Sequence, residues 1–315
     1  MRSQTAGISA YFAAIALSGL LVGGGLVWAR AETRRIVDAR GKARMETLLA
    51  EGILPVYREA RLPPLEDPFA AAWDGAPAIE VPLSPQAITM PMLETASVGT
   101  VLVQAFTDGE GIAWRLRWRD EAPDQNVDVA RFTDAVAIQF PLAAGAPFTM
   151  GDRGKRVQVL HWKGLWQKDL DEHFQDVQDL HPNYWTDLYW FARGSFPFPV
   201  PSAFGDTLSH AWLVAYRAGN SVADIHRAEP VEELSAEGFG TLTPHRDAVT
   251  RGRGVWKEGW WSVVFARPLR TEDPLDYQFR PGGKGTLGVA VWEGASGNVG
   301  GRKHYTNWIP FEVQS

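Results

Sequence analysis

Apolar side chains recur at every second position in short runs of this chain, and turn residues separate the runs. The clearest run is Gly111–Trp118, which carries apolar residues at Ile112, Trp114, Leu116 and Trp118. Successive side chains of a β-strand point to opposite faces, so this run predicts a strand with one buried face. Comparable runs predict further strands at Ala78–Leu83, Thr100–Thr107, Ala135–Phe140, Arg156–Trp162, Ala211–Tyr216, Gly254–Pro268, Thr286–Glu293 and Asn307–Val313.

One segment between these runs has the period of a helix. Lys163–Leu180 spaces its apolar residues by three and four, although its Asp and Gln content could equally make it a long covering loop. Many short strands without intervening helices favour an all-β fold, an antiparallel β-sandwich. The 14 tryptophans suit such a fold, because large aromatic side chains fill a sandwich core or line a flat ligand.

The N-terminal region differs in character from the rest of the chain. Ile8–Trp28 carries no charged residue, and its 21 residues are about the length of a membrane-spanning helix. Ala29-Arg30-Ala31 follows with the spacing of a signal-peptidase site, so a cleaved signal peptide and an uncleaved anchor both remain open. Either one predicts a periplasmic or other extracytoplasmic protein, anchored to the membrane or secreted.

The basic residues around this segment favour the opposite topology. More of them follow the hydrophobic segment than precede it, and the positive-inside rule alone would keep the C-terminal region in the cytoplasm. We therefore divide the chain into a signal anchor or signal peptide (1–31), a helical connector (32–61) and a β-sandwich domain (62–315), and leave the topology open.

Composition excludes several classes of function. The net charge of -6 gives no basic surface for nucleic acid, and the absence of cysteine excludes disulfides, iron–sulfur clusters and thiolate zinc sites. The chain has no GxSxG, P-loop or HExxH motif, and its seven histidines show no metal-ligand spacing within one element. We assign no catalytic residue.

Four segments together resemble one known family. They are DPFAAAWDGAPAIEVPLSPQAITMP (67–91), PFTMGDRGKRVQVLHWKG (147–164), GVWKEGWWSVVFARPL (254–269) and GVAVWEGASGNVGGRKHYTNW (288–308). In this order they are similar to the haem-binding (gamma) subunit of ethylbenzene dehydrogenase and of related molybdenum enzymes in the dimethyl sulfoxide reductase family. The resemblance spans the region from about residue 62 to the C-terminus.

The resemblance implies a β-sandwich that holds one haem b between a methionine and a lysine. These ligands correspond to Met150 and Lys303 in this chain. It further implies an electron-transfer subunit without its own catalytic site. The partners would be a molybdenum catalytic subunit, an iron–sulfur subunit and a soluble or membrane carrier.

Weaker candidates surround the two ligands. Arg302 and Lys163 would pair with haem propionates, as would Arg153 and Lys155, and Trp162 would flank the porphyrin, as would Trp292 and Trp308. His304 and His161 are the alternative iron ligands, because methionine with histidine is a common haem pair.

Each assignment has an alternative interpretation. Most methionines fill gaps in a core, and most strand-end lysines are solvated, so both residues could be structural. The alternative function comes from another class: a carbohydrate-binding β-sandwich module without haem, in which tryptophans form an exposed platform. In that case Met150 and Lys303 would have no reason to approach each other.

Overall fold

The computed structural model describes residues 41, 43–183, 194–195 and 200–315. The chain divides into two compact units, Met1–Glu51 and Gly52–Ser315. In the described part of the first unit, residues 43–50 are helical. The predicted span Ile8–Trp28 lies outside the described residues, and within them no helix has the length and apolarity to cross a membrane.

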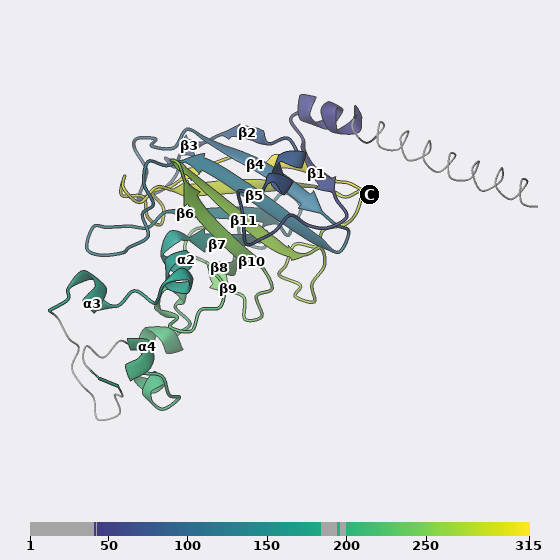
Figure 1. Cartoon of the computed structure of the whole chain (residues 1–315). Coiled ribbons are helices and arrows are strands. Elements are labelled where there is room, and N and C mark those ends of the chain that lie inside the picture. Colours follow the sequence, from purple (N-terminus) through teal and green to yellow (C-terminus); the bar gives the residue numbers. More distant parts are fainter. Residues whose placement is uncertain (1–40, 42, 184–193, 196–199) are drawn as a thin grey trace, which may run out of the picture. The chain divides into compact units, whose positions relative to one another are not determined.

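The second unit consists mainly of strands (Figure 1). The strands are β1 (Leu54–Arg58), β2 (Ile79–Pro82), β3 (Ser84–Pro85), β4 (Thr100–Thr107), β5 (Gly111–Arg119), β6 (Ala135–Pro141), β7 (Val157–Lys163), β8 (Val231–Ala236), β9 (Thr243–Pro244), β10 (Arg251–Lys257), β11 (Trp260–Pro268), β12 (Lys284–Trp292), β13 (His304–Tyr305) and β14 (Ile309–Val313). Short helices join some of them: α2 (Gly164–Asp171), α3 (Val177–Leu180), α4 (Val200–Ala203), α5 (Val214–Arg217), and the 3-10 helices η1 (Ala71–Gly75), η2 (Ser209–Trp212) and η3 (Ser221–Ala223).

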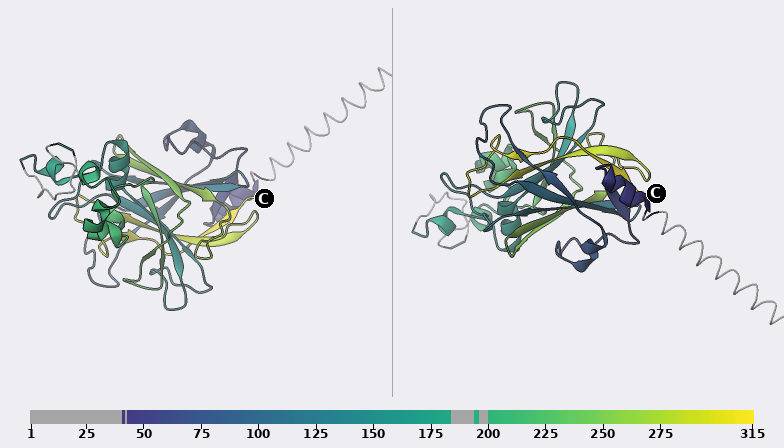
Figure 2. Two further views of the ribbon diagram at one scale, coloured as in Figure 1. Left: turned by 90° about the horizontal axis from the view of Figure 1, so that it is seen from below. Right: turned by 90° about the horizontal axis from the view of Figure 1, so that it is seen from above.

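The strands form two layers that share one strand (Figure 2). The first layer has the order β10-β11-β5-β4-β1-β14-β12, and the second continues from β12 through β6, β7 and β8 to β9. The shared strand pairs with β14 through Lys284–Leu287 and with β6 through Gly288–Trp292. β1 pairs in parallel with β14 and β4, while the other ladders are antiparallel, so the fold is a β-sandwich with one parallel strand.

A large aromatic core lies between the two layers. Trp114 of β5 makes an edge contact with Phe311 of β14 at 5.3 Å and tilted contacts with Phe140 and Phe279. The aliphatic side chains of Val136, Ile138, Leu160, Leu287, Val289 and Val291 come from the second layer into the same cluster. The predicted strand and its buried tryptophan face are confirmed, but the other face of β5 is also largely covered, since Ala113 and Arg115 are buried as well.

The opposite face of the second layer carries smaller side chains. Ala135 and Ala137 of β6 and Ala290 of β12 alternate with the large core residues of the same strands. Small residues on one face and large residues on the other leave a hollow on the small face.

Most predicted strands match the structure, with three differences. Ala211–Tyr216 is not a strand but lies in η2 and α5, and its Trp212 and Val214 are exposed, so its apolar pattern has no sheet face to bury. Gly254–Pro268 is a hairpin of β10 and β11 that turns at Glu258 and Gly259, both with positive φ. Strands β1 and β8, and the two-residue strands β3, β9 and β13, have no counterpart in the prediction. β1 falls in the predicted connector 32–61, and the second unit begins at Gly52.

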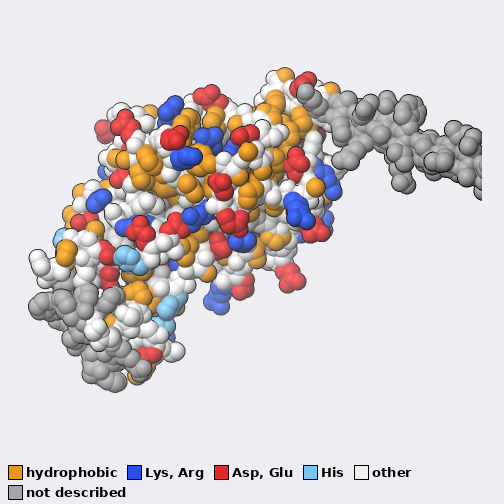
Figure 3. Space-filling view, viewed as in Figure 1, with side chains coloured by type: hydrophobic (Ala, Val, Ile, Leu, Met, Phe, Trp, Pro, Cys, Tyr) orange, Lys and Arg blue, Asp and Glu red, His pale blue; other side chains and the backbone are white. Residues whose placement is uncertain are grey.

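The predicted helix is present but interrupted. α2 and α3 cover its two ends, and Glu172 to Asp176 separate them. The charge-rich surface shown in Figure 3 intersperses acidic and basic side chains, which agrees with the absence of a basic footprint in the sequence.

Replacing Trp114 by alanine should lower the free energy of unfolding by about 3–5 kcal/mol, because the substitution leaves a cavity among aromatic neighbours that cannot close. Denaturant unfolding measures this loss. Trp212→Ala, at a side chain that is 53% exposed, should cost well under half as much. Equal losses for the two variants would contradict the assignment of the core.

Candidate functional site

A cavity of about 670 Å³ lies over the face of the second layer that carries the small side chains. Its floor is made by Ala135, Ala137, Gly288 and Ala290, and its rim by the loops around Met90, Met150 and Phe239. A volume of this size, lined mainly by apolar side chains with a few polar groups, is typical of a cofactor or small-molecule site.

Met150 and Lys303 meet inside this cavity. Their sequence positions are 153 residues apart, yet the Lys303 Nζ lies 3.5 Å from the Met150 Sδ. Both side chains line the cavity, and the Lys303 ammonium lies 5.1 Å from the centre of the Trp292 ring, another lining residue. The structure thus brings together the two residues that the sequence singles out.

The loop that carries Met150 is held in an unusual conformation. Met150 has a φ of 69°, the left-handed region that a side chain with a Cβ rarely adopts. Its carbonyl accepts a hydrogen bond from Gly238 N at 2.9 Å, and Gly151 N donates to Pro147 O at 3.1 Å. Strained residues persist only where the surroundings hold them, and they concentrate at functional sites.

Gly151 is required by this loop. Its φ is 76°, and a Cβ at this position would lie 2.6 Å from the Lys155 carbonyl oxygen and 2.9 Å from that of Ala236. Both atoms belong to the backbone and cannot move aside cheaply. The glycine therefore allows the close approach to β8 that places Met150 over the cavity.

Lys303 enters the cavity from the segment between β12 and β13. Burial lowers the pKa of its ammonium from 10.5 to about 8. A lysine in this setting gives up its proton more readily than a solvated one, and only the neutral amine has a free electron pair for a metal.

Gln86 ties the loop above the cavity to the segment of Lys303. Its backbone N donates to the Lys303 carbonyl, and its side-chain Nε2 donates to the carbonyls of Thr89, Pro91 and Gly301 at 2.9–3.2 Å. Its Oε1 accepts from the backbone N of Ile88 and Thr89. One buried amide therefore fixes the loop 86–91 and the strand end that carries the lysine.

Polar groups gather at another part of the cavity wall. His161 Nδ1 lies 2.9 Å from Glu232 Oε1. Burial raises the pKa of Glu232, but the hydrogen bonds from His161 and Ser221 together with electrostatic attraction to His161 and Lys163 outweigh it and hold that pKa below its usual value. Burial lowers the pKa of His161, so the ring is neutral, donates from Nδ1, and keeps a buried Nε2 without a hydrogen-bond partner.

Lys163 lies on the same strand face as His161. Its Nζ lies 4.7 Å from the centre of the Trp166 ring, and burial lowers its pKa. Lys163 lines the cavity and remains positioned to bind an anionic group there.

Five of the predicted residues do not line the cavity. Trp162 is wholly buried in the core between the layers, 4.9 Å from the ring of Trp261, because alternation along β7 sends it to the face opposite His161 and Lys163. Arg302 is not among the lining residues, and its guanidinium lies 5.8 Å from the centre of the Phe132 ring. Trp292 does line the cavity, whereas Trp308 packs beside it and donates to Ala146 O. Arg153 and Lys155 lie on the exposed turn that follows Met150, outside the lining.

His304, the alternative ligand next to Lys303, does not line the cavity. It points to the side of the strand opposite Lys303, where its Nε2 accepts from the backbone N of Ser97 and Val98 at 2.9 and 3.2 Å. Its Nδ1 lies 3.3 Å from the Val291 carbonyl and therefore carries the proton. Neither nitrogen is available to a metal, whereas His161 keeps one that is.

Sequence reasoning misses Gln86, Glu232 and the small residues of the cavity floor. Nothing in the local sequence marks Gln86, because its hydrogen bonds reach Gly301, 215 residues away. The floor has a readable signal: alanine and glycine alternate with large apolar residues in AVAIQF and GVAVW. That pattern indicates a strand with large apolar side chains on one face and small side chains on the other.

Comparisons with known proteins identify the family of this chain and some of its relatives. The family model described as ethylbenzene dehydrogenase matches residues 70–304. A protein assigned as a respiratory nitrate reductase haem subunit in Haloferax mediterranei is 24% identical over 249 residues, which cover 78% of this chain and 67% of that protein. The chlorate reductase gamma subunit of Ideonella dechloratans is 25% identical over 246 residues, 76% of this chain and 75% of that protein.

A likeness to solved structures is more remote. A family 9 carbohydrate-binding module from Caldicellulosiruptor kristjanssonii in complex with glucose superposes with a TM-score of 0.35 and 7% identity. The match covers 83% of this chain and 95% of that module.

Gly151→Ala should destabilise the protein by about 2–4 kcal/mol, because the added Cβ meets two backbone carbonyls in addition to the cost of left-handed φ. Gly154→Ala is the matched control, since Gly154 has a φ of 73° but no atom within 4 Å of the added Cβ. It should cost only about 1–2 kcal/mol. Denaturant unfolding of both variants measures the difference, and equal losses would contradict the packing described for Gly151.

Proposed function

The chain belongs to the ethylbenzene dehydrogenase family, and on this basis we propose that it is an electron-transfer subunit that binds one haem b. The two relatives above are haem or gamma subunits of reductases, which supports this proposal. The observation that carries it is the meeting of Met150 and Lys303 in a cofactor-sized cavity. We propose these two side chains as the axial ligands of the haem iron.

The donor chemistry of the pair fits a haem. A thioether is soft and neutral, and an amine in a buried site is easily deprotonated, so both can give an electron pair to iron. The present 3.5 Å between Sδ and Nζ is shorter than two metal–ligand bonds of about 2 Å each, so an iron between them requires the side chains to separate. Methionine and lysine both have several rotatable bonds, which allow that adjustment.

The rest of the cavity fits the same group. Ala135, Ala137, Gly288 and Ala290 leave apolar space beside Met150 and Lys303 in which a flat macrocycle would fit. Lys163 supplies a positive charge for a propionate, and His161 remains the alternative ligand because its Nε2 is buried and unpartnered. When bound, a haem b accepts and releases one electron at a time.

Two neutral ligands in an apolar pocket favour the reduced state. The oxidised haem carries a net positive charge that the dry cavity solvates poorly, so desolvation raises the reduction potential. Filling both axial positions leaves none for oxygen or substrate. The residues are therefore suited to electron transfer and not to catalysis.

The proposed partners follow from the relatives. We propose that the chain works with a molybdenum catalytic subunit and an iron–sulfur subunit, and passes electrons between them and a soluble or membrane carrier. The cavity rim supports contact with a partner, because Ile88, Met90, Phe239 and Leu242 line the cavity and are also exposed to solvent.

The carbohydrate-binding alternative has less support. Of the tryptophans that the structure describes, Trp73, Trp114, Trp118, Trp162, Trp166 and Trp261 are fully buried, which leaves little for an exposed sugar platform. Sugar binding by such a module does not require Met150 and Lys303 to lie close to each other.

The full chain, expressed with haem available, should show a low-spin haem b spectrum that sharpens on reduction with dithionite. Met150→Ala and Lys303→Ala should each convert part or all of the haem to high spin, because one axial position opens. Absorbance spectra of the oxidised and reduced protein measure both effects.

Met92→Ala and Lys284→Ala serve as matched controls, since both residues lie outside the lining of this cavity. Their spectra should equal that of the wild type. A colourless protein would refute haem binding, and unchanged spectra for both Met150→Ala and Lys303→Ala would refute the ligand assignment.

We also propose that the domain is extracytoplasmic, supported by the uncharged segment Ile8–Trp28. Protease added to intact spheroplasts should then degrade the domain while a cytoplasmic marker protein survives. Protection of the domain until detergent opens the membrane would place it in the cytoplasm, as the basic residues after the segment would suggest.

A further inference from the structure

A second group of buried polar side chains lies on the core side of the second layer, away from the haem cavity. Glu233 of β8 faces opposite to Glu232, and His245 follows β9, with its backbone N donating to the Glu233 carbonyl at 2.9 Å. Asp273 and Asp276 come from the loop after β11. Three separate segments therefore converge on one point.

The donor atoms of this cluster are closely spaced. His245 Nδ1 lies 3.2 Å from Asp276 Oδ1, 3.6 Å from Asp273 Oδ2 and 3.9 Å from Glu233 Oε2. The ligand atoms of Glu233, His245 and Asp276 all lie within 4.8 Å of one another. Ligands that share one ion at about 2.0–2.2 Å have separations in this range.

Several of these atoms are buried without a hydrogen bond. The His245 side chain is 0% exposed, yet neither ring nitrogen makes a hydrogen bond, and Glu233 Oε2 also lacks one. The other Glu233 oxygen is occupied, because it accepts from Thr250 N and Thr250 Oγ1. A buried polar atom without a partner costs free energy, and coordination to an ion would supply the partner that each of these atoms needs.

The charges of the cluster are unbalanced. Asp273, Asp276 and Glu233 contribute three carboxylates, and the fixed cation beside them is Arg267, whose NH2 lies 3.1 Å from Asp276 Oδ2. A divalent cation would neutralise the site and leave the imidazole free to act as a ligand.

We propose that Glu233, His245, Asp273 and Asp276 form a binding site for a divalent transition-metal ion of the zinc class. The imidazole nitrogen favours such an ion over Ca²⁺ or Mg²⁺, which take oxygen ligands. The ion joins the loop after β11 to β8 and to the segment after β9, so its role is structural and independent of electron transfer.

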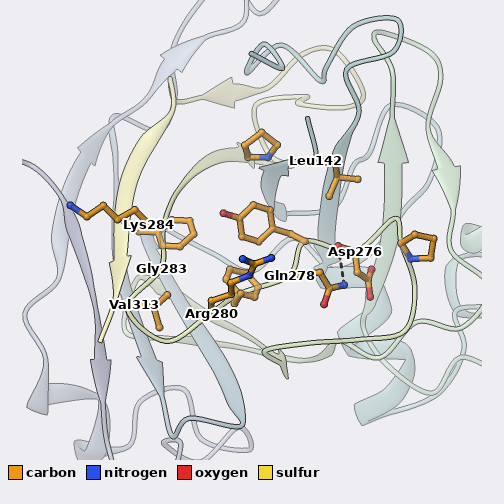
Figure 4. A pocket seen from close by; sticks show the side chains of 12 residues that line it. Leu142, Asp276, Gln278, Arg280, Gly283, Lys284 and Val313 are labelled. Carbon is orange, nitrogen blue, oxygen red and sulfur yellow. Dashed lines mark hydrogen bonds between the residues drawn. The ribbon is translucent and has the colours of Figure 1, made fainter. Parts of the chain in front are cut away.

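A second cavity adjoins the cluster at Asp276. It has a volume of about 520 Å³, and its wall also includes the exposed residues Arg280 and Lys284 (Figure 4). Gln278 holds the same wall, because its Nε2 donates to the Asp276 carbonyl at 3.2 Å. This cavity is separate from the one that Met150 and Lys303 line.

The test uses the full haem-loaded chain without a histidine tag. After treatment with a chelator, the protein is dialysed against Zn²⁺ and then against metal-free buffer, and its metal content is measured by mass spectrometry. We expect one Zn²⁺ per chain and a Tm about 5 °C higher at a hundredfold excess over Kd. His245→Gln should lose the zinc and the Tm shift but keep the haem spectrum.

His173→Gln is the matched control, because His173 is 61% exposed and lies outside the cluster. It should bind zinc like the wild type. Asp273→Asn, at a side chain that is 27% exposed, gives a second variant if His245→Gln does not fold, and it should weaken zinc binding at least tenfold.

Less than 0.2 equivalents of zinc on the wild type, with no Tm shift, would overturn the proposal and leave the cluster as an internal ion network. Binding of Ca²⁺ in place of Zn²⁺ would overturn the assigned class of ion. The haem spectrum is read on the same samples, so failure here and failure of the proposed function are distinguishable.

Discussion

The two faces of the second layer carry side chains of very different size, and the arrangement of the domain depends on that difference. On one face, Val136, Ile138 and Phe140 pack with the aromatic residues of the first layer. On the other face, Ala135 and Ala137 are too small to fill the space above them. The large face supplies the hydrophobic stabilisation that folding needs, while the small face is left hollow for a cofactor.

The two candidate ligands, Met150 and Lys303, come from loops that lie over the small-residue face of the second layer. Met150 is held in left-handed backbone conformation by Gly151 and by a hydrogen bond to Gly238, and Lys303 is held by Gln86. Left-handed backbone strain costs free energy and persists only where the surrounding structure holds it. A buried amide is likewise costly unless its hydrogen bonds are satisfied. The two proposed ligands are thus held by separate supports, one on the β7–β8 side and one on the β12–β13 segment.

The sequence predicts the layers better than it predicts the site. Period-two alternation identifies β4 and β5, because each buries one face over its whole length. The same rule fails for Ala211–Tyr216, where the apolar residues have no sheet to pack against. Trp162 shows a related error. The family resemblance predicts that Trp162 flanks the cofactor, but the alternation of side chains along β7 places it in the core between the two layers.

Contacts between distant segments cannot be read from either segment alone. From the local sequence, Lys303 would be interpreted as a solvated lysine, but the fold places it against Met150. His304 is a candidate ligand in the sequence, but in the fold its Nε2 accepts hydrogen bonds from the backbone N of Ser97 and Val98. The resemblance to a family predicts Met150 and Lys303 as a ligand pair, whereas the buried cluster at His245 is visible only in the folded chain.

X-ray absorption at the iron edge of the haem-loaded chain tests the central claim most directly, because sulfur and nitrogen ligands scatter differently. The wild type should show one sulfur ligand, which Met150→Ala should lose and Lys303→Ala should keep. An iron shell of nitrogen alone in the wild type, or a sulfur signal that survives Met150→Ala, would contradict the placement of the haem between Met150 and Lys303.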